Sequence, residues 1–386
     1  MNRSRDRDQI LYIGLVTGNG GDAVQMLELA AGMIRRGRGA RIMLPRVDAT
    51  VAFAEQCQER GVPVERTSLL RADITGTRQN PIDVVRLFRQ TSASTLHLHT
   101  GNDCLPRTVM LALALLRLPP AFVTLQSPYS TLRPGDARAR AWAVAAPRQF
   151  RKVICPSEHA LETQRAYGVP APVLQCIYNG VDIARYAGGD GSLVRAELGL
   201  ERDTPLIVFT SRMDRQKRPL DLLEAFVGIA AEFPAAHLAF VGTGALTEAV
   251  KIAAVDARVA ARVHFAGHRS NIPDWLAAAT VWAMPTESEN FSLAILEALA
   301  AGCPVLSTWC RGNDEILVDN RNALTFPVGD VSAMTTALRR LLATPDLRSR
   351  LSAAARVTAQ DHSLNRTIAA YAECYAASPD LSVTGL

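Results

Sequence analysis

The sequence holds little lysine, no paired cysteines and no long apolar run. Only three of its 42 basic residues are lysines, so each lysine in a motif position is informative. The seven cysteines are scattered and form no C-x-x-C pair, which argues against disulfides and a zinc site and favours a reducing compartment. The longest apolar stretch, Val109–Leu118, contains Arg117 and is too short to cross a bilayer.

The composition is that of a globular protein with room for two domains. The chain has 386 residues, 48% hydrophobic and 20% charged. Its first ten residues, MNRSRDRDQI, carry charge and no apolar segment, so we expect no secretory signal and a cytoplasmic protein. Residues 1–183 hold 23 basic and 15 acidic side chains (net +8), and residues 184–386 hold 19 and 22 (net −3). The basic half favours an anionic acceptor or a membrane surface, although an ordinary solvated surface explains the same excess.

Strand-like and helix-like segments alternate along the whole chain, which predicts an α/β fold with parallel sheets and helices on both faces. The strands form two series, separated by the Gly- and Asp-rich stretch 178–192, where we expect a hinge. We therefore predict two doubly wound domains, 1–182 and 183–363, facing a deep cleft, and a C-terminal helix in 364–386 that crosses back to the first domain. The expected strands are Ile10–Thr17, Ala40–Leu44, Thr95–His99, Ala121–Leu125, Lys152–Cys155 and Val173–Ile177, then Leu206–Thr210, His237–Val241, Val263–Ala266, Val281–Met284 and Pro304–Ser307.

The turn after the first strand is rich in glycine. Either a tight strand-to-helix turn requires these glycines, or they bind a phosphate. Gly18, Gly20 and Ala23 fit a relaxed G-x-G-x-x-G/A pattern, which brings backbone N–H groups to a phosphate at a helix N-terminus. Arg46, at the end of the second strand, is suited to a 2′-phosphate. An NADP-dependent oxidoreductase is therefore one alternative function.

Two residues near strand ends and one basic stretch are further candidate functional features in the first half of the chain. His99 ends one strand and is expected to point into the cleft, with a core histidine as the alternative. Gln126 follows the next strand at a similar level. The stretch Arg133–Lys152 is basic and amphipathic, and is either an ordinary exposed helix or a contact to an anionic acceptor or lipid headgroups.

In the second half, Arg212 and Lys217 follow the strand Leu206–Thr210 in the segment RMDRQKRP. A guanidinium and an ammonium at a strand-to-helix turn are suited to bind a diphosphate and to neutralise it as it departs. A surface pair that stabilises the turn is the alternative.

The segment TESENFSLAILEALAAGCPVLS predicts a buried helix over 293–301, capped by Ser292 and ended by Gly302. Glu297 lies within this helix, and a buried carboxylate needs partners. An internal arginine is one candidate, and the vicinal hydroxyls of a ribose are the other. The first amides of the helix, from Asn290 to Leu293, are suited to a phosphate, and Glu289 would lie beside whatever is attached beyond it.

These motifs resemble those of the family 4 retaining glycosyltransferases of the GT-B fold, which consists of two Rossmann-like domains. ESENFSLAILEALAAGCPVLST resembles the family's Glu–seven residues–Glu motif, and SRMDRQKRP resembles its phosphate clamp. Further blocks follow in the family's order over nearly the whole chain: GGDAVQMLELAAGMIRRG, CPSEHALE, IYNGVD, VGTGALTE and VHFAGHRSNIPDWLAAATVWAMPTESEN.

The resemblance implies roles for individual residues. Arg212 and Lys217 would bind the donor diphosphate and stabilise it as leaving group, and Glu289 would contact the donor sugar. Glu297 would bind the ribose hydroxyls. The other implied contacts are phosphate binding by Asn290, Phe291, Ser292 and Leu293, closure over the reaction centre by Gly20 and Gly21, and base binding by His268 and Arg269.

The chain departs from the family pattern at several positions. Asn290 and Ser292 replace two glycines. Gln126 stands where a histidine near the donor sugar is common, and it does not titrate near neutral pH. Arg311 replaces a small residue, which places it, with His99 and Gln126, among candidates for the sugar or acceptor side.

The expected reaction moves a hexose-type sugar from a nucleoside diphosphate, uridine rather than guanosine, to an acceptor hydroxyl with retention. We expect no metal or other cofactor, since the only D-x-D lies at Asp6–Asp8, ahead of the first strand. No nucleic acid is expected as a partner. The acceptor is unknown, with a lipid-linked or anionic molecule favoured, and the protein would then lie peripherally on the inner face of a membrane through Arg133–Lys152. A sugar-nucleotide epimerase and a catalytically silent partner subunit are further alternatives.

Overall fold

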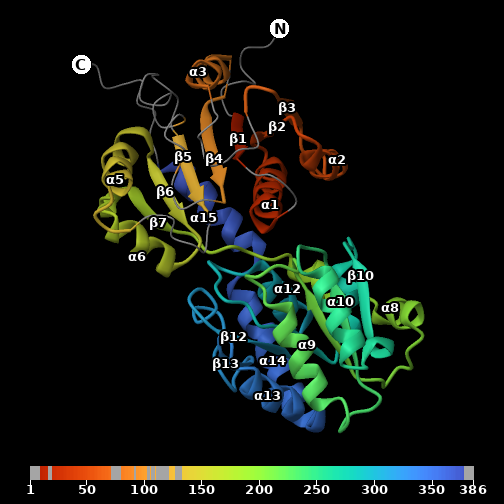
Figure 1. Ribbon diagram of the computed structural model, residues 1–386. Coiled ribbons are helices and arrows are strands. Elements are labelled where there is room, and N and C mark those ends of the chain that lie inside the picture. The colour runs from red at the N-terminus through yellow and green to blue at the C-terminus, as the bar shows by residue number, and fades with distance from the viewer. Residues whose placement is uncertain are drawn as a thin grey trace. The chain divides into compact units, whose positions relative to one another are not determined.

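The computed structural model describes residues 9–15, 20–70, 80–90, 93–101, 105, 109, 121–126 and 133–377. The chain divides into two compact units. The first comprises Met1–Asn179 with Asn365–Leu386, and the second comprises Gly180–Leu364 (Figure 1). Each unit has its own parallel sheet, as expected for two doubly wound domains. The cleft that we expected between the domains stays a prediction.

Seven strands form the sheet of the first unit, in the order β3-β2-β1-β4-β5-β6-β7, and every neighbouring pair is parallel. The order reverses between β1 and β4, the position where open α/β sheets bind ligands. The strands are β1 (Gln9–Leu15), β2 (Gly39–Pro45), β3 (Val64–Thr67), β4 (Thr95–Thr100), β5 (Ala121–Leu125), β6 (Lys152–Cys155) and β7 (Leu174–Cys176).

Apolar side chains on both faces of this sheet are covered by helices. On one face Leu11 and Ile13 of β1 join a core cluster that includes Trp142 of α5. Tyr12, which alternates with them, lies on the opposite face and contacts α15. The helices are α1 (Gly21–Arg35), α2 (Val51–Glu59), α3 (Pro81–Gln90), α5 (Ala137–Gln149), α6 (Glu158–Ala166) and α15 (Leu364–Ala376).

The last helix, α15, is held in the first unit by buried hydroxyl and imidazole groups. The Tyr375 hydroxyl is hydrogen-bonded to Nδ1 of His97, whose Nε2 lies 2.8 Å from Oγ1 of Thr124. The Tyr371 hydroxyl lies 3.1 Å from the same Thr124 oxygen. A Cβ at Gly32 of α1 would lie 2.3 Å from a methyl of Ile368, so glycine permits the close approach of α1 and α15. The expected crossing of the C-terminal helix to the first domain is confirmed.

Six parallel strands form the sheet of the second unit, in the order β10-β9-β8-β11-β12-β13. The reversal lies between β8 and β11, where Ile207 is opposite Val281 and Val208 is opposite Trp282. The strands are β8 (Leu206–Thr210), β9 (His237–Val241), β10 (Val263–Gly267), β11 (Val281–Met284), β12 (Val305–Trp309) and β13 (Leu324–Pro327).

The helices of the second unit pack as two layers. One layer holds α9, α10 and α13, in which α9 contacts both of the others, and the other holds α7, α8, α11, α12 and α14. Figure 1 shows α9 and α10 on the near side of this unit. The bounds are α7 (Ile183–Ala187), α8 (Gly191–Leu198), α9 (Pro219–Ile229), α10 (Thr247–Asp256), α11 (Ile272–Ala278), α12 (Leu293–Ala301), α13 (Val331–Ala343) and α14 (Pro345–Asp361).

Two strands, β3 and β13, were not predicted. Both lie at an edge of their sheet, and both are short. The sequence of β3, Val-Glu-Arg-Thr, is half charged, and β13 ends in Pro327. Edge strands tolerate charge and proline because one side needs no partner, and this removes the apolar pattern that predicts a strand.

Candidate active site

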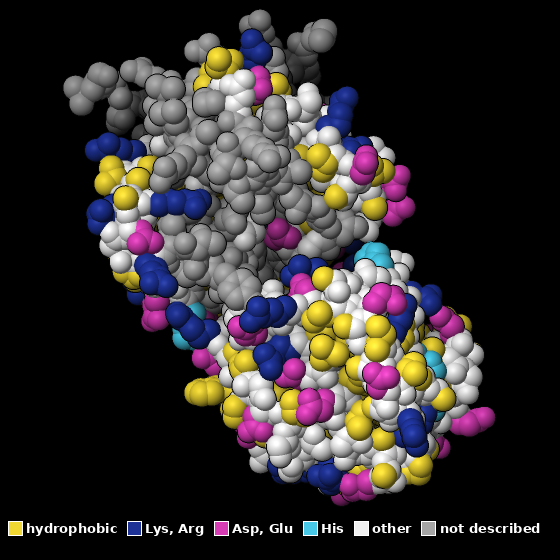
Figure 2. Space-filling view, in the orientation of Figure 1, with side chains coloured by type: hydrophobic (Ala, Val, Ile, Leu, Met, Phe, Trp, Pro, Cys, Tyr) yellow, Lys and Arg dark blue, Asp and Glu magenta, His cyan; other side chains and the backbone are white. Residues whose placement is uncertain are grey.

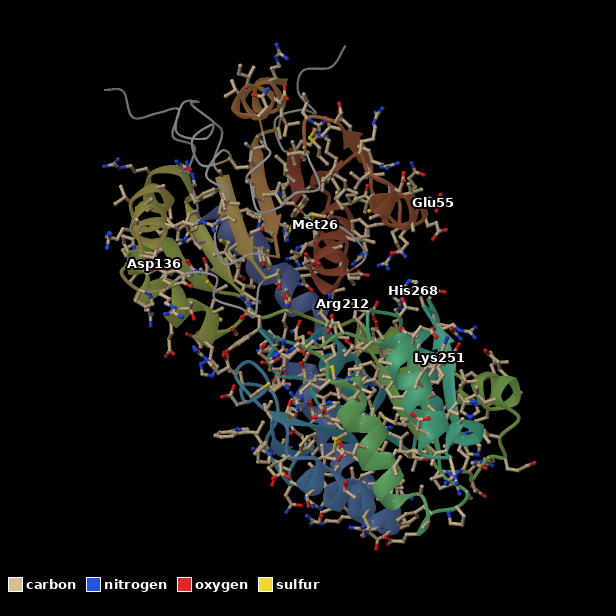
Figure 3. The ribbon with its side chains drawn as sticks, in the orientation of Figure 1. Met26, Glu55, Asp136, Arg212, Lys251 and His268 are labelled. Carbon is tan, nitrogen blue, oxygen red and sulfur yellow. The ribbon has the colours of Figure 1, made fainter. Side chains whose placement is uncertain are left out.

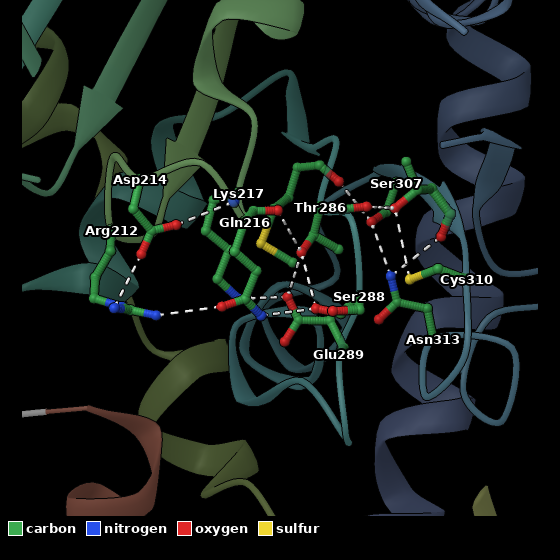
Figure 4. Close-up of polar contacts among 12 residues, drawn as sticks. Arg212, Asp214, Gln216, Lys217, Thr286, Ser288, Glu289, Ser307, Cys310 and Asn313 are labelled. Carbon is green, nitrogen blue, oxygen red and sulfur yellow. Dashed lines mark hydrogen bonds and ion pairs between the residues drawn. The ribbon is translucent and has the colours of Figure 1, made fainter. Parts of the chain in front are cut away.

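The switch point of the second sheet brings together the loops after β8 and β11. The first loop carries Arg212 and Lys217, and the second carries Thr286 and Glu289. Gln216 joins them, because its backbone oxygen accepts from the amide of Glu287 at 2.7 Å and its Nε2 donates to the backbone oxygen of Ser288 at 2.8 Å. The two loops therefore form one hydrogen-bonded structure at the carboxyl end of the sheet (Figure 4).

Lys217 and Glu289 form an ion pair inside this structure. Their side chains are only 11% and 9% exposed. The Glu289 oxygen that meets the ammonium also accepts a hydrogen bond from Oγ1 of Thr286 at 2.7 Å. The Lys217 side chain is thus neither exposed to solvent nor part of a surface pair that stabilises the turn. A pair sheltered in this way interacts strongly, because little water screens it.

The loop after β8 is fixed by its own acidic residue. Oδ1 of Asp214 accepts from the amide of Lys217 at 3.1 Å, and Oδ2 of Asp214 lies 2.9 Å from the guanidinium of Arg212. Arg218 follows with φ of 49°, a left-handed conformation that turns the chain into α9. Neither Asp214 nor Gln216 was assigned a role from the sequence, although both lie within the motif RMDRQKRP.

Arg212 is an accessible cation of this site. Its side chain is 66% exposed, and its guanidinium contacts Asp214 and, at 3.4 Å, Oε1 of Gln216. In Figure 3 Arg212 lies at the same end of the second unit as His268, which follows β10. The two predicted cations therefore differ: Lys217 is buried and paired with Glu289, whereas Arg212 is available to a ligand from solvent.

Strand β12 and the loop that follows it both hold the segment that carries Glu289. Oγ1 of Thr308 donates to the backbone oxygen of Thr286 at 2.6 Å, and the amide of Glu289 donates to the backbone oxygen of Arg311 at 3.4 Å. Gly312 has φ of 87°, and a Cβ there would lie 2.4 Å from the backbone oxygen of Glu289. The side chain of Arg311 is exposed. In this structure, Arg311 thus holds the site through its backbone.

Helix α12 begins and ends where the sequence predicts. Asn290, Phe291 and Ser292 precede it and are buried, and Leu293 is half-buried. Ser292 occupies the N-cap position, but its side chain makes no capping hydrogen bond, so that part of the prediction is wrong. A helix leaves its first N–H groups without intrahelical acceptors, and these are the groups suited to a phosphate.

Glu297 is half-buried, and its partner is neither an arginine nor any residue that the sequence suggested. The hydroxyl of Tyr186, in α7, donates to Oε1 of Glu297 at 2.7 Å. Burial raises the pKa of this carboxyl to about 7, while the Tyr186 hydrogen bond and the charge of Arg185 act in the opposite direction. The carboxyl is therefore poised to titrate near neutral pH.

The two residues assigned to base binding lie in different settings. His268 is exposed after β10. Arg269 forms an ion pair with Glu197, donates to the backbone oxygen of Ala266 at 3.0 Å, and lies over the ring of Trp275. His268 is therefore open to a ligand, whereas the guanidinium of Arg269 already has three internal contacts.

In the first unit, Gly20 and Gly21 begin α1 at the carboxyl end of β1. The carboxylate of Asp22 lies against the backbone here, since a Cβ at Gly20 would come within 2.6 Å of its Oδ1 and one at Gly101 within 3.2 Å of its Oδ2. Asp22 therefore lies between the end of β4 and the start of α1. Glycine at both positions leaves room for this arrangement.

His99 and Gln126 both face protein groups. His99 is 0% exposed and lies 4.3 Å from the ring of His97, and in the described part of the chain neither of its ring nitrogens has a hydrogen-bond partner. Burial lowers its pKa to about 3. Its ring faces the core because His97 and His99 share one face of β4, so its position does not support the expected orientation into a cleft. Gln126 exchanges two amide hydrogen bonds with Asn179, of 3.1 and 3.2 Å.

The residues behind the oxidoreductase alternative gain no support. Gly18 lies outside the described residues, and Ala23 is buried in α1. The guanidinium of Arg46 donates to the backbone oxygen of Arg66 at 3.1 and 3.3 Å. It is therefore already engaged in a backbone contact.

The basic stretch Arg133–Lys152 contains α5. Trp142 is buried and donates to Oε1 of Gln164 at 2.8 Å, whereas Arg140 and Arg148 are exposed. Figure 2 shows dark-blue basic side chains over this part of the molecule. Within the described ranges no helix is long and apolar enough to cross a membrane.

Two family models match the chain. Residues 19–185 match the model described as Glycosyltransferase Family 4, and residues 204–344 match the one described as Glycosyl transferases group 1. The resemblance seen in the motifs is confirmed.

Curated relatives of this chain are named as glycosyltransferases. The D-inositol 3-phosphate glycosyltransferase of Streptomyces scabiei is 31% identical over 240 residues, which cover 59% of this chain and 54% of the relative. The lipopolysaccharide core biosynthesis glycosyltransferase LpsE of Rhizobium meliloti is 32% identical over 167 residues, which cover 42% and 48%. The chain thus spans about half the length of the curated relatives that it matches.

Solved structures share the fold. The crystal structure of Anabaena HepE in complex with UDP and glucose is 20% identical and superposes with a TM-score of 0.81, over 96% of this chain and 99% of that one. The predicted fold of two Rossmann-like domains of the GT-B type is confirmed.

Proposed function

We propose that this chain, which belongs to the glycosyltransferases through its family 4 and group 1 domains, moves a hexose-type sugar from a nucleoside diphosphate to an acceptor hydroxyl. A uridine diphosphate is the preferred carrier. Support comes from the Anabaena HepE structures, whose complexes hold UDP, UDP with glucose, and UDP-glucose. The names of the relatives, which mention D-inositol 3-phosphate and lipopolysaccharide core biosynthesis, support an acceptor from carbohydrate or glycolipid assembly.

The observation that carries the proposal is the paired Lys217 and Glu289 at the switch point of the second sheet. A donor diphosphate bound here would compete with Glu289 for the ammonium, and Arg212 would approach it from the solvent side. The released Glu289 carboxylate would then accept hydrogen bonds from the donor sugar. The site thus combines the buried cation Lys217, the exposed cation Arg212 and the carboxylate of Glu289 within two linked loops.

Helix α12 would hold the rest of the donor. The amides from Asn290 to Leu293 are proposed to bind a phosphate at the positive end of the helix. Glu297, one turn further, is proposed to accept hydrogen bonds from both ribose hydroxyls. His268 is the proposed base contact, with Arg269 positioning the same loop through its bond to Ala266.

We propose a retaining mechanism without a protein nucleophile. The bond between the anomeric carbon and the diphosphate breaks, and its electron pair leaves with the nucleoside diphosphate. The acceptor oxygen bonds to the same face of the carbon, and its proton passes to the departing diphosphate. Arg212 and Lys217 stabilise the charge that develops on the leaving group, so we propose that no metal is required.

For the sugar or acceptor side we propose roles for Arg311 of the second unit and for Gln126 of the first, and Gly20 and Gly21 of the first unit are proposed to close over the reaction centre. The exposed arginines of Arg133–Lys152 would attract a lipid-linked or anionic acceptor at a membrane surface. In this proposal the protein is cytoplasmic and peripheral to that surface.

A thermal-shift panel tests the donor assignment. We expect UDP and UDP-sugars to raise the melting temperature of the wild-type protein, GDP-sugars to raise it less, and NADPH to leave it unchanged. A rise with NADPH alone would support the oxidoreductase alternative. Conversion of a UDP-sugar in the absence of any acceptor other than water separates the remaining alternatives, because an epimerase yields a second nucleotide-sugar and a transferase yields UDP.

A further inference from the structure

A hydrogen bond between one tyrosine and one glutamate joins α7 to α12, which pack against each other. Tyr186 lies in the five-residue helix α7, is 7% exposed, and donates its hydroxyl proton to Oε1 of Glu297 at 2.7 Å. Asp182 caps α7 by accepting from the amide of Arg185 at 3.2 Å, and the Arg185 guanidinium lies over the Tyr186 ring at 5.4 Å. The tyrosine is thus held in place by both its backbone and its neighbour.

This hydrogen bond leaves part of the carboxylate available. An ionised carboxylate has two oxygens with about four acceptor positions. Tyr186 uses one position on Oε1, which fixes the rotation of the group while leaving Oε2 for a ligand. The same contact favours the ionised form, because a hydroxyl donates better to a carboxylate than to a protonated acid.

We propose that Tyr186 is a positioning residue that holds Glu297 as an oriented carboxylate for the donor ribose, and that this contact sets the pH range over which the donor binds. The inference rests on the proposed function, since it assumes that Glu297 accepts from the ribose. The inference adds Tyr186 to the site. It also predicts that donor binding depends on pH, which the chemistry of the donor alone does not require.

The groups around Glu297 determine how its ionisation, and therefore donor binding, changes with pH. Burial raises the pKa of the carboxyl to about 7, and Tyr186 and Arg185, both on α7, lower it. From α11, the Asp274 carboxylate is engaged with the amide of Asp190, and from α14, Arg356 lies against Gly302 at the far end of α12. The ionised form, which accepts from ribose hydroxyls, therefore becomes populated as the pH rises through neutrality. Loss of the Tyr186 hydroxyl would move that transition to higher pH.

The test is the affinity for UDP-glucose, measured by calorimetry from pH 5.5 to 8.5, of the wild type and Tyr186→Phe. UDP-glucose suits this range because its diphosphate has no proton that titrates near neutral pH. For the wild type we expect affinity to rise with a midpoint near pH 7. For Tyr186→Phe we expect the midpoint to rise by about one unit, which weakens binding about fivefold at pH 7 and less than twofold at pH 8.5.

Two control variants make the outcome specific. Glu297→Gln removes the titrating group, so its affinity is expected to be low and independent of pH. Tyr371→Phe removes another buried phenol hydroxyl, in the first unit, where it lies 3.1 Å from Oγ1 of Thr124, and we expect a wild-type pH profile. Circular dichroism confirms that each variant is folded.

The failures of the two proposals are distinguishable. If the wild type binds no UDP-glucose at any pH, the proposed function fails and the inference with it. If the wild type binds and Glu297→Gln binds weakly, but Tyr186→Phe matches the wild type at every pH, only the inference fails. It fails also if Tyr186→Phe is weaker by the same factor throughout the range, since that result indicates loss of packing alone.

Discussion

The ammonium of Lys217 is bound to the carboxylate of Glu289, although the two residues lie 72 positions apart in the chain. The pair joins the loop after β8 to the loop after β11, and Thr286 donates to the same carboxylate oxygen. Both charges are largely withdrawn from water, so each is stabilised mainly by the other. In the proposed mechanism, a diphosphate that enters the site would replace Glu289 as partner of the lysine, and the carboxylate would then be available to the sugar.

Gly312→Ala tests whether the loop after β12 fixes Glu289. Alanine at this position combines a positive φ of 87° with a Cβ only 2.4 Å from the Glu289 backbone oxygen, so the loop must move. We expect a loss of stability above the ~1 kcal/mol of the backbone conformation alone, together with at least tenfold lower transfer activity. Gly199→Ala is the matched control, because its φ is 65° and, among the described residues other than its chain neighbours, no atom lies within 4 Å of the added Cβ. Equal stability and activity in the two variants would contradict the role given to the loop.

Glu297 should make the protein less stable as the pH rises. Its folded-state pKa of about 7 is above the ordinary value of 4.5, so the folded protein holds a proton that the unfolded chain releases between these values. The stabilisation is complete below about pH 4.5 and is lost by about pH 7. Relative to the wild type, the free energy of unfolding of Glu297→Gln should be higher at pH 8 than at pH 5, by an amount of the order of 2 kcal/mol. Denaturant unfolding of both proteins at pH 5 and pH 8 gives these free energies. A difference between the two proteins that is the same at both pH values would refute the raised pKa of Glu297.

The first unit should be sensitive to acid through His97 and His99. Burial lowers the pKa of both, to about 3 for His99 and well below 6.5 for His97. The unfolded chain therefore binds protons below about pH 6.5 that the folded unit does not, and stability falls as the pH falls from that value. We expect His99 to cost about 2 kcal/mol between pH 7 and pH 5, and His97 to add to this loss in the same direction.

The variant His99→Phe separates this effect from general acid unfolding. It keeps a ring against His97 and Tyr12 but cannot titrate, so the loss of stability between pH 7 and pH 5 should be smaller than in the wild type. Thermal unfolding at the two pH values is the measurement. An unchanged loss would show that His99 does not contribute.

Much of the fold follows from local pattern. The strands Ala121–Leu125, Leu206–Thr210 and Val281–Met284 and the helix Leu293–Ala301 have the predicted bounds, because apolar runs with clear ends determine them. The edge strands β3 and β13 were missed, since charge and proline interrupt the pattern there. The other two edge strands, β7 and β10, were predicted, so what decides the outcome is whether the apolar pattern is interrupted.

The partners of the site residues were less predictable than the residues themselves. The motifs pointed to Lys217, Glu289 and Glu297, but nothing in them indicated that the first two bind each other. Tyr186 lies 111 positions before Glu297, and its hydroxyl reaches the carboxylate only because α7 packs on α12. His99 was expected in a cleft, and its burial follows from the packing of β4 that a strand-end position does not specify. Contacts of this kind depend on tertiary structure.

The most direct test of the central claim compares Lys217→Ala with Lys251→Ala. Lys251 is a surface lysine of α10 that pairs with Glu248, so the control removes the same charge away from the proposed site (Figure 3). The measurement is the rate of UDP release from a UDP-sugar, with its affinity determined in parallel. We predict that Lys217→Ala loses about a hundredfold or more in rate and less in affinity, because the lysine stabilises the leaving group more than the bound donor, while Lys251→Ala matches the wild type. Equal rates for the two variants would contradict a donor site built on Lys217 and Glu289.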